Sequence, residues 1–206
     1  ISLWANPNQP DIIKQQGIVG NEGTGIMAVI HPAHGSNWGT QSNNAGVGIN
    51  VGTNQIQIVE HTHLFIASPL VFTTQLVGWN HIVLIYDQHL PKLFVNGVLV
   101  ATGLVSQIQN VHPSSGFCNV YSQSGFGSSF YPNGNPIGNF YGSYDDIGIW
   151  NRALDSTEVK NLYNASPCNL TFSFPQDTIL GCKQDSVLID AGSGFASYNW
   201  SNGDST

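Results

Sequence analysis

Charged side chains are scarce in this sequence. Only 8% of the 206 residues are Asp, Glu, Lys or Arg, against about a quarter in an average soluble protein. Five Lys and Arg against twelve Asp and Glu give a net charge of −7, so the chain lacks a basic surface that could neutralise phosphates. This balance argues against nucleic acid and against anionic membrane surfaces as partners.

Long hydrophobic runs are missing too. No apolar run approaches the roughly 20 residues that a membrane-spanning helix needs, which argues against membrane insertion. Residues 1–5 have neither the basic flank nor the cleavage pattern of a signal peptide and look like the interior of a strand. Glycine is plentiful instead, with 23 residues, and 41% of the chain is apolar, which is enough to fill a core. The composition predicts an all-β fold.

Cysteine is rare and odd in number. With three cysteines, at most one disulfide can form within the chain. Cys168 and Cys182 are the better candidates, because both lie in the loop-rich C-terminal part and would close a short loop. We interpret Cys118 as a small buried hydrophobe, since no nearby cation would activate its thiol. Low charge and scarce Lys favour a secreted or cell-surface protein over a cytoplasmic one.

Short apolar runs alternate with Gly, Asn, Pro and Ser clusters, as in a sandwich or barrel. The clearest run lies in GWNHIVLIYDQHLPKLFVNGVLVATG, residues 78–103. Residues 79–86 are almost continuously apolar, which predicts a strand covered on both faces, and we expect Pro91 to stop it. The predicted strands are residues 1–5, 17–20, 25–31, 46–51, 55–60, 71–76, 79–86, 92–95, 98–102, 119–122 and 144–150.

Asn96-Gly97 is a strong signal for a hairpin. A type I′ turn needs positive φ at both central positions, which Asn and Gly tolerate. Residues 92–95 and 98–101 should therefore pair antiparallel. Alternation then places Leu93 and Val95 on one face of the hairpin and Phe94 on the other.

One short helix is predicted in NRALDSTEVKNLYN. Asp155 can cap it, and Glu158 three residues later completes a capping box, with Leu154 and Val159 placed to form a hydrophobic staple. Two turns of helix are marginal alone, so this helix must dock on the sandwich. Its apolar stripe consists of Val159, Leu162 and Tyr163.

The composition and pattern of the sequence change after the helix. Pro167 and Pro175 bracket a linker-like stretch, and two strand patterns follow at 186–190 and 196–200. So few residues cannot bury a core of their own. We therefore predict two parts: a jelly-roll domain at 1–166, and a linker with a partial immunoglobulin-like domain at 167–206.

Two phrases together identify a family. The segment 78–103, followed by YGSYDDIGIWNRALDSTEVKNLYN, resembles the laminin-G-like, concanavalin A-like lectin/glucanase superfamily in its bacterial surface-protein form. The resemblance covers about residues 1–165. It implies a two-sheet antiparallel jelly-roll sandwich with one short C-terminal helix. Members usually have another strand or two before the phrase ISLWANP, so an N-terminal strand is expected to be missing here.

The chemistry of a glycan hydrolase is not evident. Retaining enzymes need paired carboxyl groups about 5–5.5 Å apart, and the only acids between residues 12 and 144 are Glu22, Glu60 and Asp87. Asp145 and Asp146 are expected to point to opposite faces of a strand. We therefore predict that the protein is not an enzyme.

Metal ligands have two candidate locations. His61 and His63 share a strand face, and His31 and His34 lie close in sequence, but a third zinc ligand is not evident. The resemblance implies a structural Ca²⁺, for which Asp145 is the best carboxylate and Asn21 and Glu22 are possible loop ligands. The alternative is that Asp145 accepts main-chain hydrogen bonds.

Carbohydrate contacts are expected in polar loops. Trp38, Tyr131 and Asn133 offer aromatic rings for sugar faces and an amide for hydroxyl groups, although such aromatics also serve as loop anchors. The expected function is a non-enzymatic module that binds a glycan or a surface protein within a multi-domain, adhesin-like protein. The alternative is a structural module of a surface appendage, with neighbouring domains or other copies as partners.

Overall fold

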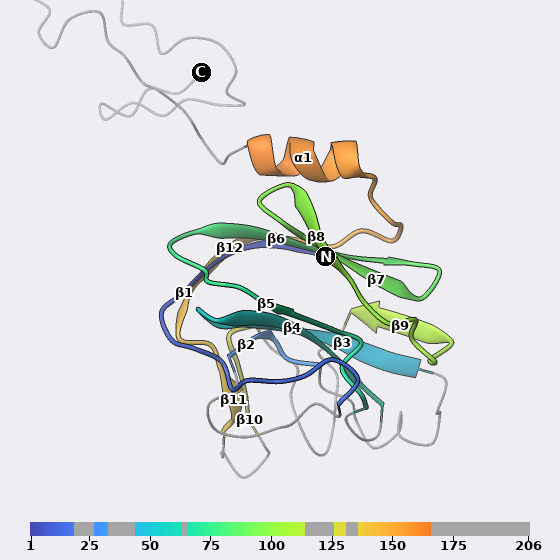
Figure 1. Ribbon diagram of the computed structural model, residues 1–206, viewed down its shortest axis with the longest axis horizontal. Helices are drawn as coiled ribbons and strands as arrows, with labels where there is room; N and C mark the ends of the chain where they lie inside the picture. Colours follow the sequence, from blue (N-terminus) through green and yellow to red (C-terminus); the bar gives the residue numbers. More distant parts are fainter. Residues whose placement is uncertain (19–26, 33–43, 63–65, 114–125, 131–135, 166–206) are drawn as a thin grey trace, which may run out of the picture. The chain divides into compact units, whose positions relative to one another are not determined.

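A computed structural model describes residues 1–18, 27–32, 44–62, 66–113, 126–130 and 136–165. The chain separates into two units between Ser166 and Pro167, and every described residue belongs to the first. In this part the predicted all-β class is confirmed, with strands in two layers and one short helix (Figure 1). No helix in the described ranges is long and apolar enough to cross a membrane.

The first sheet has five antiparallel strands in the order β12-β1-β6-β7-β8. Its central strand β6 pairs with β1 on one side and with β7 on the other. The edges of the sheet are β12 and β8. The strands are β1 (Ser2–Pro7), β6 (Asn80–Asp87), β7 (Leu90–Val95), β8 (Val98–Thr102) and β12 (Gly142–Gly148).

The second sheet has the order β2-β3-β4-β5, with every neighbouring pair antiparallel. A further strand, β9, runs parallel to the start of β3, a pairing that the antiparallel expectation does not include. Two more strands, β10 and β11, form a separate antiparallel pair. The bounds are β2 (Ala28–Ile30), β3 (Asn44–Val51), β4 (Gln55–His61), β5 (Leu70–Thr73), β9 (Asn110–Pro113), β10 (Ser128–Phe130) and β11 (Pro136–Asn139).

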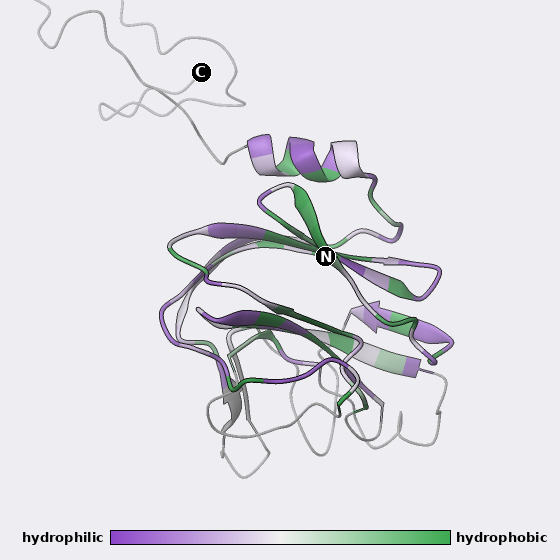
Figure 2. Ribbon diagram, viewed as in Figure 1, coloured by the Kyte–Doolittle hydropathy of each residue, from purple (hydrophilic) through white to green (hydrophobic). Residues whose placement is uncertain are grey.

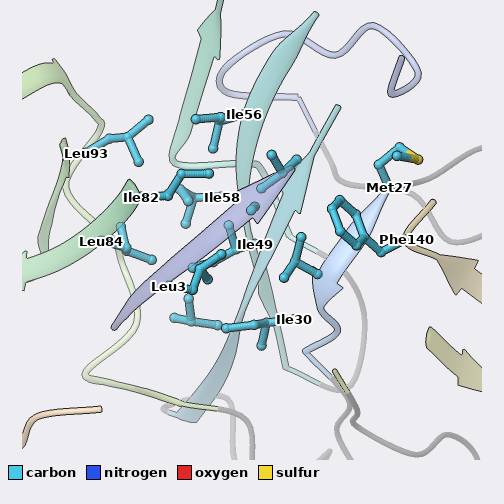
Figure 3. Close-up of a cluster of buried hydrophobic side chains, with 14 of the residues drawn as sticks. Leu3, Met27, Ile30, Ile49, Ile56, Ile58, Ile82, Leu84, Leu93 and Phe140 are labelled. Atoms are coloured by element: carbon cyan, nitrogen blue, oxygen red, sulfur yellow. The ribbon is translucent and has the colours of Figure 1, made fainter. Parts of the chain in front are cut away.

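The main core lies between the two sheets. Each strand contributes alternate side chains to it, as the period of two requires. Burying one such aliphatic side chain stabilises the fold by about 1.5–3 kcal/mol. Members labelled in the close-up include Leu3, Ile49, Ile56, Ile58, Ile82, Leu84 and Leu93, which gather in the space between the layers (Figure 3).

A second, smaller core lies under the helix α1 (Ser156–Asn164), whose hydrophobic residues lie toward the first sheet (Figure 2). Val83, Ile85 and Phe94 of the sheet meet Leu154 and Val159 there. This cluster explains why β6 is buried on both faces. It also confirms that Phe94 and Leu93 project from opposite faces of their strand.

The predicted helix cap is confirmed. Glu158 N donates to Asp155 Oδ1 at 2.8 Å, and Asp155 N donates to Glu158 Oε2 at 2.9 Å. These two bonds satisfy donors that the first turn of a helix cannot pair internally. The helix therefore begins where the sequence places its start.

The hairpin turn is confirmed, with φ of 51° at Asn96 and 78° at Gly97. The prediction that Pro91 stops the strand is wrong, since Pro91 lies within β7, opposite Tyr86. The preceding turn uses positive φ at Gln88 and His89 instead. Hydrogen-bonded and non-hydrogen-bonded pairs alternate along an antiparallel ladder, so a proline is tolerated where its missing N–H is not needed.

Candidate functional site

Trp4 lies on the outer face of the first sheet. Trp4 points outward, because its neighbours Leu3 and Ala5 belong to the main core and side chains alternate along a strand. Across the strands, Trp4 is paired with Asp145 of β12, and Asn6 with Ser143. Directly opposite residues project from the same face of a sheet, so these four side chains form one outward-facing group.

The ring of Trp4 is fixed by its neighbours. It lies 5.1 Å from the ring of His81 and 5.9 Å from that of Tyr163, with an angle of 26° to the latter. His81 is buried, and its Nε2 lies 2.9 Å from Ser2 Oγ. Burial lowers the pKa of His81, and the charge of Asp146 acts in the opposite direction.

Trp79 is held outward by the short loop that leads into β6. Its side chain is 48% exposed, and that of Val77 is 87% exposed. Asn80 Nδ2 donates to the carbonyl groups of Val77 and Gly78 at 3.3 and 3.0 Å, and Gly78 supplies a φ of 65°. The loop is therefore shaped by main-chain contacts while its two apolar side chains face solvent.

The Asn-Gly turn supports this loop from the neighbouring strand. Asn96 Nδ2 donates to Asn80 Oδ1 at 3.0 Å, and Asn96 Oδ1 accepts from His81 N at 2.9 Å. Asn96 thus ties the hairpin turn to the residue that holds the Trp79 loop. This network explains why Trp-Asn-His and Asn-Gly occur together in the sequence.

We call the surface formed by Trp4, Asn6, Trp79, Ser143 and Asp145 the tryptophan face. We assign Trp79 to it by extending the alternation of β6 (Asn80–Asp87) one residue back, since Trp79 lies two residues before His81, which projects from this face. The face combines aromatic rings with an amide, a hydroxyl and a carboxylate, and it has no cation of its own. Such a set can stack on a flat apolar ligand surface while accepting hydrogen bonds around it.

The strict alternation of side chains along a strand does not hold at Asp145 and Asp146. The pairing of β12 with β1 slips between Ser2 and Trp4, and Asp146 has a φ of 49°, so a bulge interrupts the alternation. Asp145 Oδ1 accepts from Asp146 N at 2.8 Å. Both side chains are exposed, and Asp146 acts on His81 of the outer face. The regular alternation on which the expectation for these two carboxylates depends is therefore interrupted at Asp146.

Two other carboxyl groups are buried, away from this face. Asp11 Oδ1 accepts from Ile12 N at 2.8 Å and from Met27 N at 3.1 Å, and Glu60 accepts bonds from Tyr86 and Ser106. Burial raises the pKa of both carboxyl groups. Because the hydrogen-bond partners of both carboxyl groups belong to the surrounding fold, we assign these two groups a structural role.

The described ranges contain only some of the predicted metal ligands. His31 and His61 are buried, and burial followed by the nearby charge of His61 lowers the pKa of His31 to about 4. In those ranges no three or more His, Cys, Asp or Glu side chains form a group that could hold a metal. The remaining metal and disulfide candidates lie outside the described residues: Asn21, Glu22, His34, His63, Cys168 and Cys182.

The predicted glycan contacts, Trp38, Tyr131 and Asn133, also lie outside the described residues. Of the sequence candidates, the structure places only Asp145 on the tryptophan face. The exposure of Trp79 and the position of Asn6 were missed. One sequence signal could have identified Trp79: it is a large aromatic residue that follows a glycine directly before an otherwise buried strand.

Comparison with known proteins gives a family and distant structural likenesses. The family model described as concanavalin A-like lectin/glucanases superfamily matches residues 1–160. Similar solved structures include the receptor binding domain of botulinum neurotoxin type G, with a TM-score of 0.47 and 16% identity over 79% of this chain and 36% of that one. No curated protein matches the chain.

Two further structures are also distantly similar, the second more weakly than the first. The binding domain of botulinum neurotoxin DC, solved in complex with rat synaptotagmin II, has a TM-score of 0.46 and 14% identity, covering 79% of this chain and 34% of that chain. An S-layer domain-containing protein from Clostridium thermocellum has a TM-score of 0.29 and 17% identity, with coverages of 76% and 69%. The chain spans about a third of the length of the toxin domains.

Proposed function

The chain belongs to the concanavalin A-like lectin/glucanases superfamily, and from this premise we propose that it is a non-enzymatic module that binds carbohydrate on its tryptophan face. The module would serve a secreted, multi-domain, adhesin-like protein of the cell surface. The observation that carries the proposal is the exposed Trp79, which a hydrogen-bonded loop holds beside polar groups.

The side chains around Trp79 have the chemistry that a sugar needs. A pyranose ring has an apolar face that stacks on an indole, and hydroxyl groups that bond to amides and carboxylates. Asn6 and Ser143 are neighbours across two strands, and Asp145 follows two residues later. The overall charge of −7 and the lack of a cation on this face favour a neutral glycan over an acidic one.

Exposure of the carboxylates supports a binding rather than a hydrolytic role. A glycosidase needs one carboxyl group whose environment keeps it protonated, together with a second that acts as nucleophile or base. Asp145 and Asp146 are both exposed, so neither has the apolar surroundings of a general acid. Glu60, whose pKa is raised by burial, is enclosed within the protein.

A glycan array probed with the protein and with Trp79→Ala tests the proposal. Loss of a stacked indole should weaken binding about tenfold or more, which corresponds to at least about 1.4 kcal/mol. Phe126→Ala is the matched control, because Phe126 is also 48% exposed but lies beside β2, outside the tryptophan face. A silent array, or equal binding by Trp79→Ala, would refute the proposal.

Calcium belongs to the same proposal, with Asp145 as one ligand and Asn21 and Glu22 as further ligands. The exposed carboxylate of Asp145 is a hard oxygen donor of the kind that Ca²⁺ prefers. Calcium should raise the melting temperature of the protein but not that of Asp145→Asn, and a chelator should reverse the effect. Equal melting curves with calcium and with chelator would remove the ion from the proposal.

The remaining expectations are carried forward as proposals. Trp38, Tyr131 and Asn133 would extend the carbohydrate contacts, and Cys168 and Cys182 would form a disulfide in the unit that follows residue 166. Array binding by a Trp38→Ala variant and a thiol count under denaturing conditions test these two points. An array that is silent for every glycan would favour the alternative of a structural module.

A further inference from the structure

Tyr163, near the C-terminal end of α1, lies against the tryptophan face, where the helix packs on the outer side of the first sheet (Figure 1). Its ring centre is 5.9 Å from that of Trp4 at an angle of 26°, and 6.0 Å from that of His81 at 27°. Aromatic rings stabilise each other at separations of about 4.5–7 Å. Because Trp4 and His81 are direct neighbours across β1 and β6, one tyrosine ring contacts two adjacent outward-facing rings.

The two tryptophans of the face differ in how much of each ring is available. Trp4 is only partly exposed, because His81 flanks its ring at 5.1 Å and Tyr163 stacks on it. Trp79 is 48% exposed. Trp4 is therefore an aromatic surface of the kind that a sugar needs, but the helix already occupies it.

Gly97 makes room for the tyrosine ring. A Cβ at position 97 would lie only 3.1 Å from Cδ1 of Tyr163, so the ring lies directly against the main chain of the hairpin turn. The same turn contains Asn96, whose side chain supports the loop that carries Trp79. Tyr163 thus lies close to the loop of Trp79 as well as against Trp4.

The two ends of α1 are held unequally. A capping box fixes the first turn, and Val159 is buried. The last turn, all of which the structure describes, has no basic side chain to offset the partial negative charge of the final carbonyl groups. Its C-cap, Ala165, has a φ of −74° rather than the left-handed conformation that commonly ends a helix. Weakly held segments open at the lowest free energy, so the turn that carries Tyr163 is the part of α1 that is easiest to displace.

We propose that the last turn of α1 is a displaceable cover over Trp4, and that a neutral oligosaccharide displaces Tyr163 and stacks on Trp4 and Trp79 together. This inference rests on the proposed carbohydrate binding and deepens it, because it specifies a chain of at least two pyranose rings. Trp4 is a second sugar subsite that is closed in the free protein. Tyr163 and one sugar ring compete for the same indole.

The register of the sheet gives the spacing of the two subsites. Trp4 lies opposite His81, and Trp79 is two residues before His81, so extending this pairing makes Trp79 the diagonal neighbour of Trp4. Diagonal neighbours in an antiparallel pair are about 7–8 Å apart and within reach of aromatic side chains. In the same extended register Asn6 lies directly opposite Trp79, where its amide can bond to sugar hydroxyl groups. Two linked sugar rings can contact both indoles, whereas a monosaccharide contacts one.

Competition with Tyr163 lowers the affinity of the site for a sugar chain. A ligand that binds only the open form is weakened in proportion to the fraction of molecules that are open. Removal of the tyrosine ring abolishes this loss for every sugar chain that uses Trp4. A sugar that stacks on Trp79 alone gains nothing.

Titration of the wild type and of Tyr163→Ala with glucose and with cellotetraose tests the proposal. Cellotetraose is neutral, and its β-1,4-linked rings have flat apolar faces. Tyr163→Ala should bind it about threefold or more tightly than the wild type, which corresponds to the loss of one aromatic pair. Glucose should bind both proteins equally. The double variant Tyr163→Ala with Trp4→Ala should lose the gain.

Tyr163→Phe retains the ring and should therefore retain the cover. Asn161→Ala, at an exposed site in the same turn, is the matched control for a substitution in the helix. Amide hydrogen exchange on the wild type gives a second measurement that requires no variant to fold. Cellotetraose should speed exchange of the Ala165 amide, which bonds to Asn161 O at 2.7 Å, about threefold or more, while the Val159 amide stays unchanged.

The outcomes separate this inference from the proposed function. Equal affinity of the wild type and Tyr163→Ala for cellotetraose would overturn the cover, and weaker binding by Tyr163→Ala would make Tyr163 a sugar contact instead. Both results leave the carbohydrate proposal standing. Failure of both proteins to bind cellotetraose, with other glycans bound on the array, would overturn the inferred sugar chain. An array that is silent for the wild type and for Tyr163→Ala would refute the proposed function and this inference together.

Discussion

Tyr86 and Glu60 connect the two sheets through a hydrogen bond of 2.7 Å from Tyr86 Oη to Glu60 Oε1. The other carboxylate oxygen accepts from Ser106 Oγ, also at 2.7 Å. Glu60 is only 1% exposed. Burial raises its pKa, and the hydrogen bonds from Tyr86 and Ser106 and the nearby His89 counteract this effect only in part.

Glu60→Gln should therefore change how stability depends on pH. Because the native pKa of Glu60 is raised above its ordinary value of 4.5, the native state holds the proton more tightly than the unfolded state. The resulting stabilisation is fully present below the unfolded pKa and is lost as pH rises through the native pKa. Urea unfolding from about pH 4 to about pH 8 should show the wild type losing stability relative to Glu60→Gln, by about 1.4 kcal/mol for each unit of pKa shift.

Glu158→Gln is the control for this experiment, because its shift has the opposite sign. The hydrogen bond from Arg152 lowers the pKa of Glu158 to about 2. Its stabilisation is present above the unfolded pKa and is lost as pH falls through about 2. Its effect should therefore be constant across the neutral range. Parallel stability curves for the wild type and Glu60→Gln would show that Glu60 is not responsible.

Asn96→Ala should destabilise the protein by about 2 kcal/mol. The substitution leaves His81 N without its acceptor and Asn80 Oδ1 without its donor, and unsatisfied buried groups cost about 1–3 kcal/mol. It also places an alanine at a φ of 51°. Chemical denaturation measures the total change.

Asn96→Gly separates the two causes. Glycine accepts the positive φ without strain but makes neither side-chain hydrogen bond. The loss in Asn96→Gly therefore measures the hydrogen bonds, and the further loss in Asn96→Ala measures the strain. Equal stability of Asn96→Gly and the wild type would mean that the network around Asn80 contributes nothing.

Much of the fold could be predicted from the sequence because the patterns that specify it are local. The Asn96-Gly97 turn and the Asp155 cap each depend on a few consecutive residues whose backbone preferences are known. The errors come from pairing between distant segments. Whether Pro91 can lie in a strand depends on whether its pair with Tyr86 is one of the hydrogen-bonded pairs between β6 and β7. The bulge at Asp146 depends on the register of β12 with β1.

Less of the candidate site than of the fold could be predicted from the sequence. The spacing of Trp79 relative to His81 predicts its face, but its exposure results from the way in which Asn80 and Asn96 meet across two strands. The resemblance predicts Asp145 as a calcium ligand, whereas its position beside Trp4 follows from the register of β1 and β12.

Gly97→Ala should cost more stability than Gly78→Ala. Both glycines have positive φ, 78° and 65°, so alanine suffers about 1–2 kcal/mol of backbone strain at either position. At Gly97 a new Cβ would also lie 3.1 Å from Cδ1 of Tyr163, whereas at Gly78 it meets nothing within 4 Å. The difference between the two unfolding free energies isolates that contact, and equal losses would mean that the Tyr163 ring moves aside without cost.

Asp155→Ala should loosen α1 and, through it, the packing of Trp4. Loss of an N-cap costs about 1 kcal/mol, and the helix has only nine residues, so its docking depends on the cap and on the buried Val159. Tyr163, near the C-terminal end of α1, stacks on the ring of Trp4. Near-ultraviolet circular dichroism should therefore weaken along with stability. Ser156→Ala, whose exposed side chain is not the cap, is the matched control, and an unchanged aromatic signal in Asp155→Ala would show that Trp4 is held by His81 and the sheet without help from the helix.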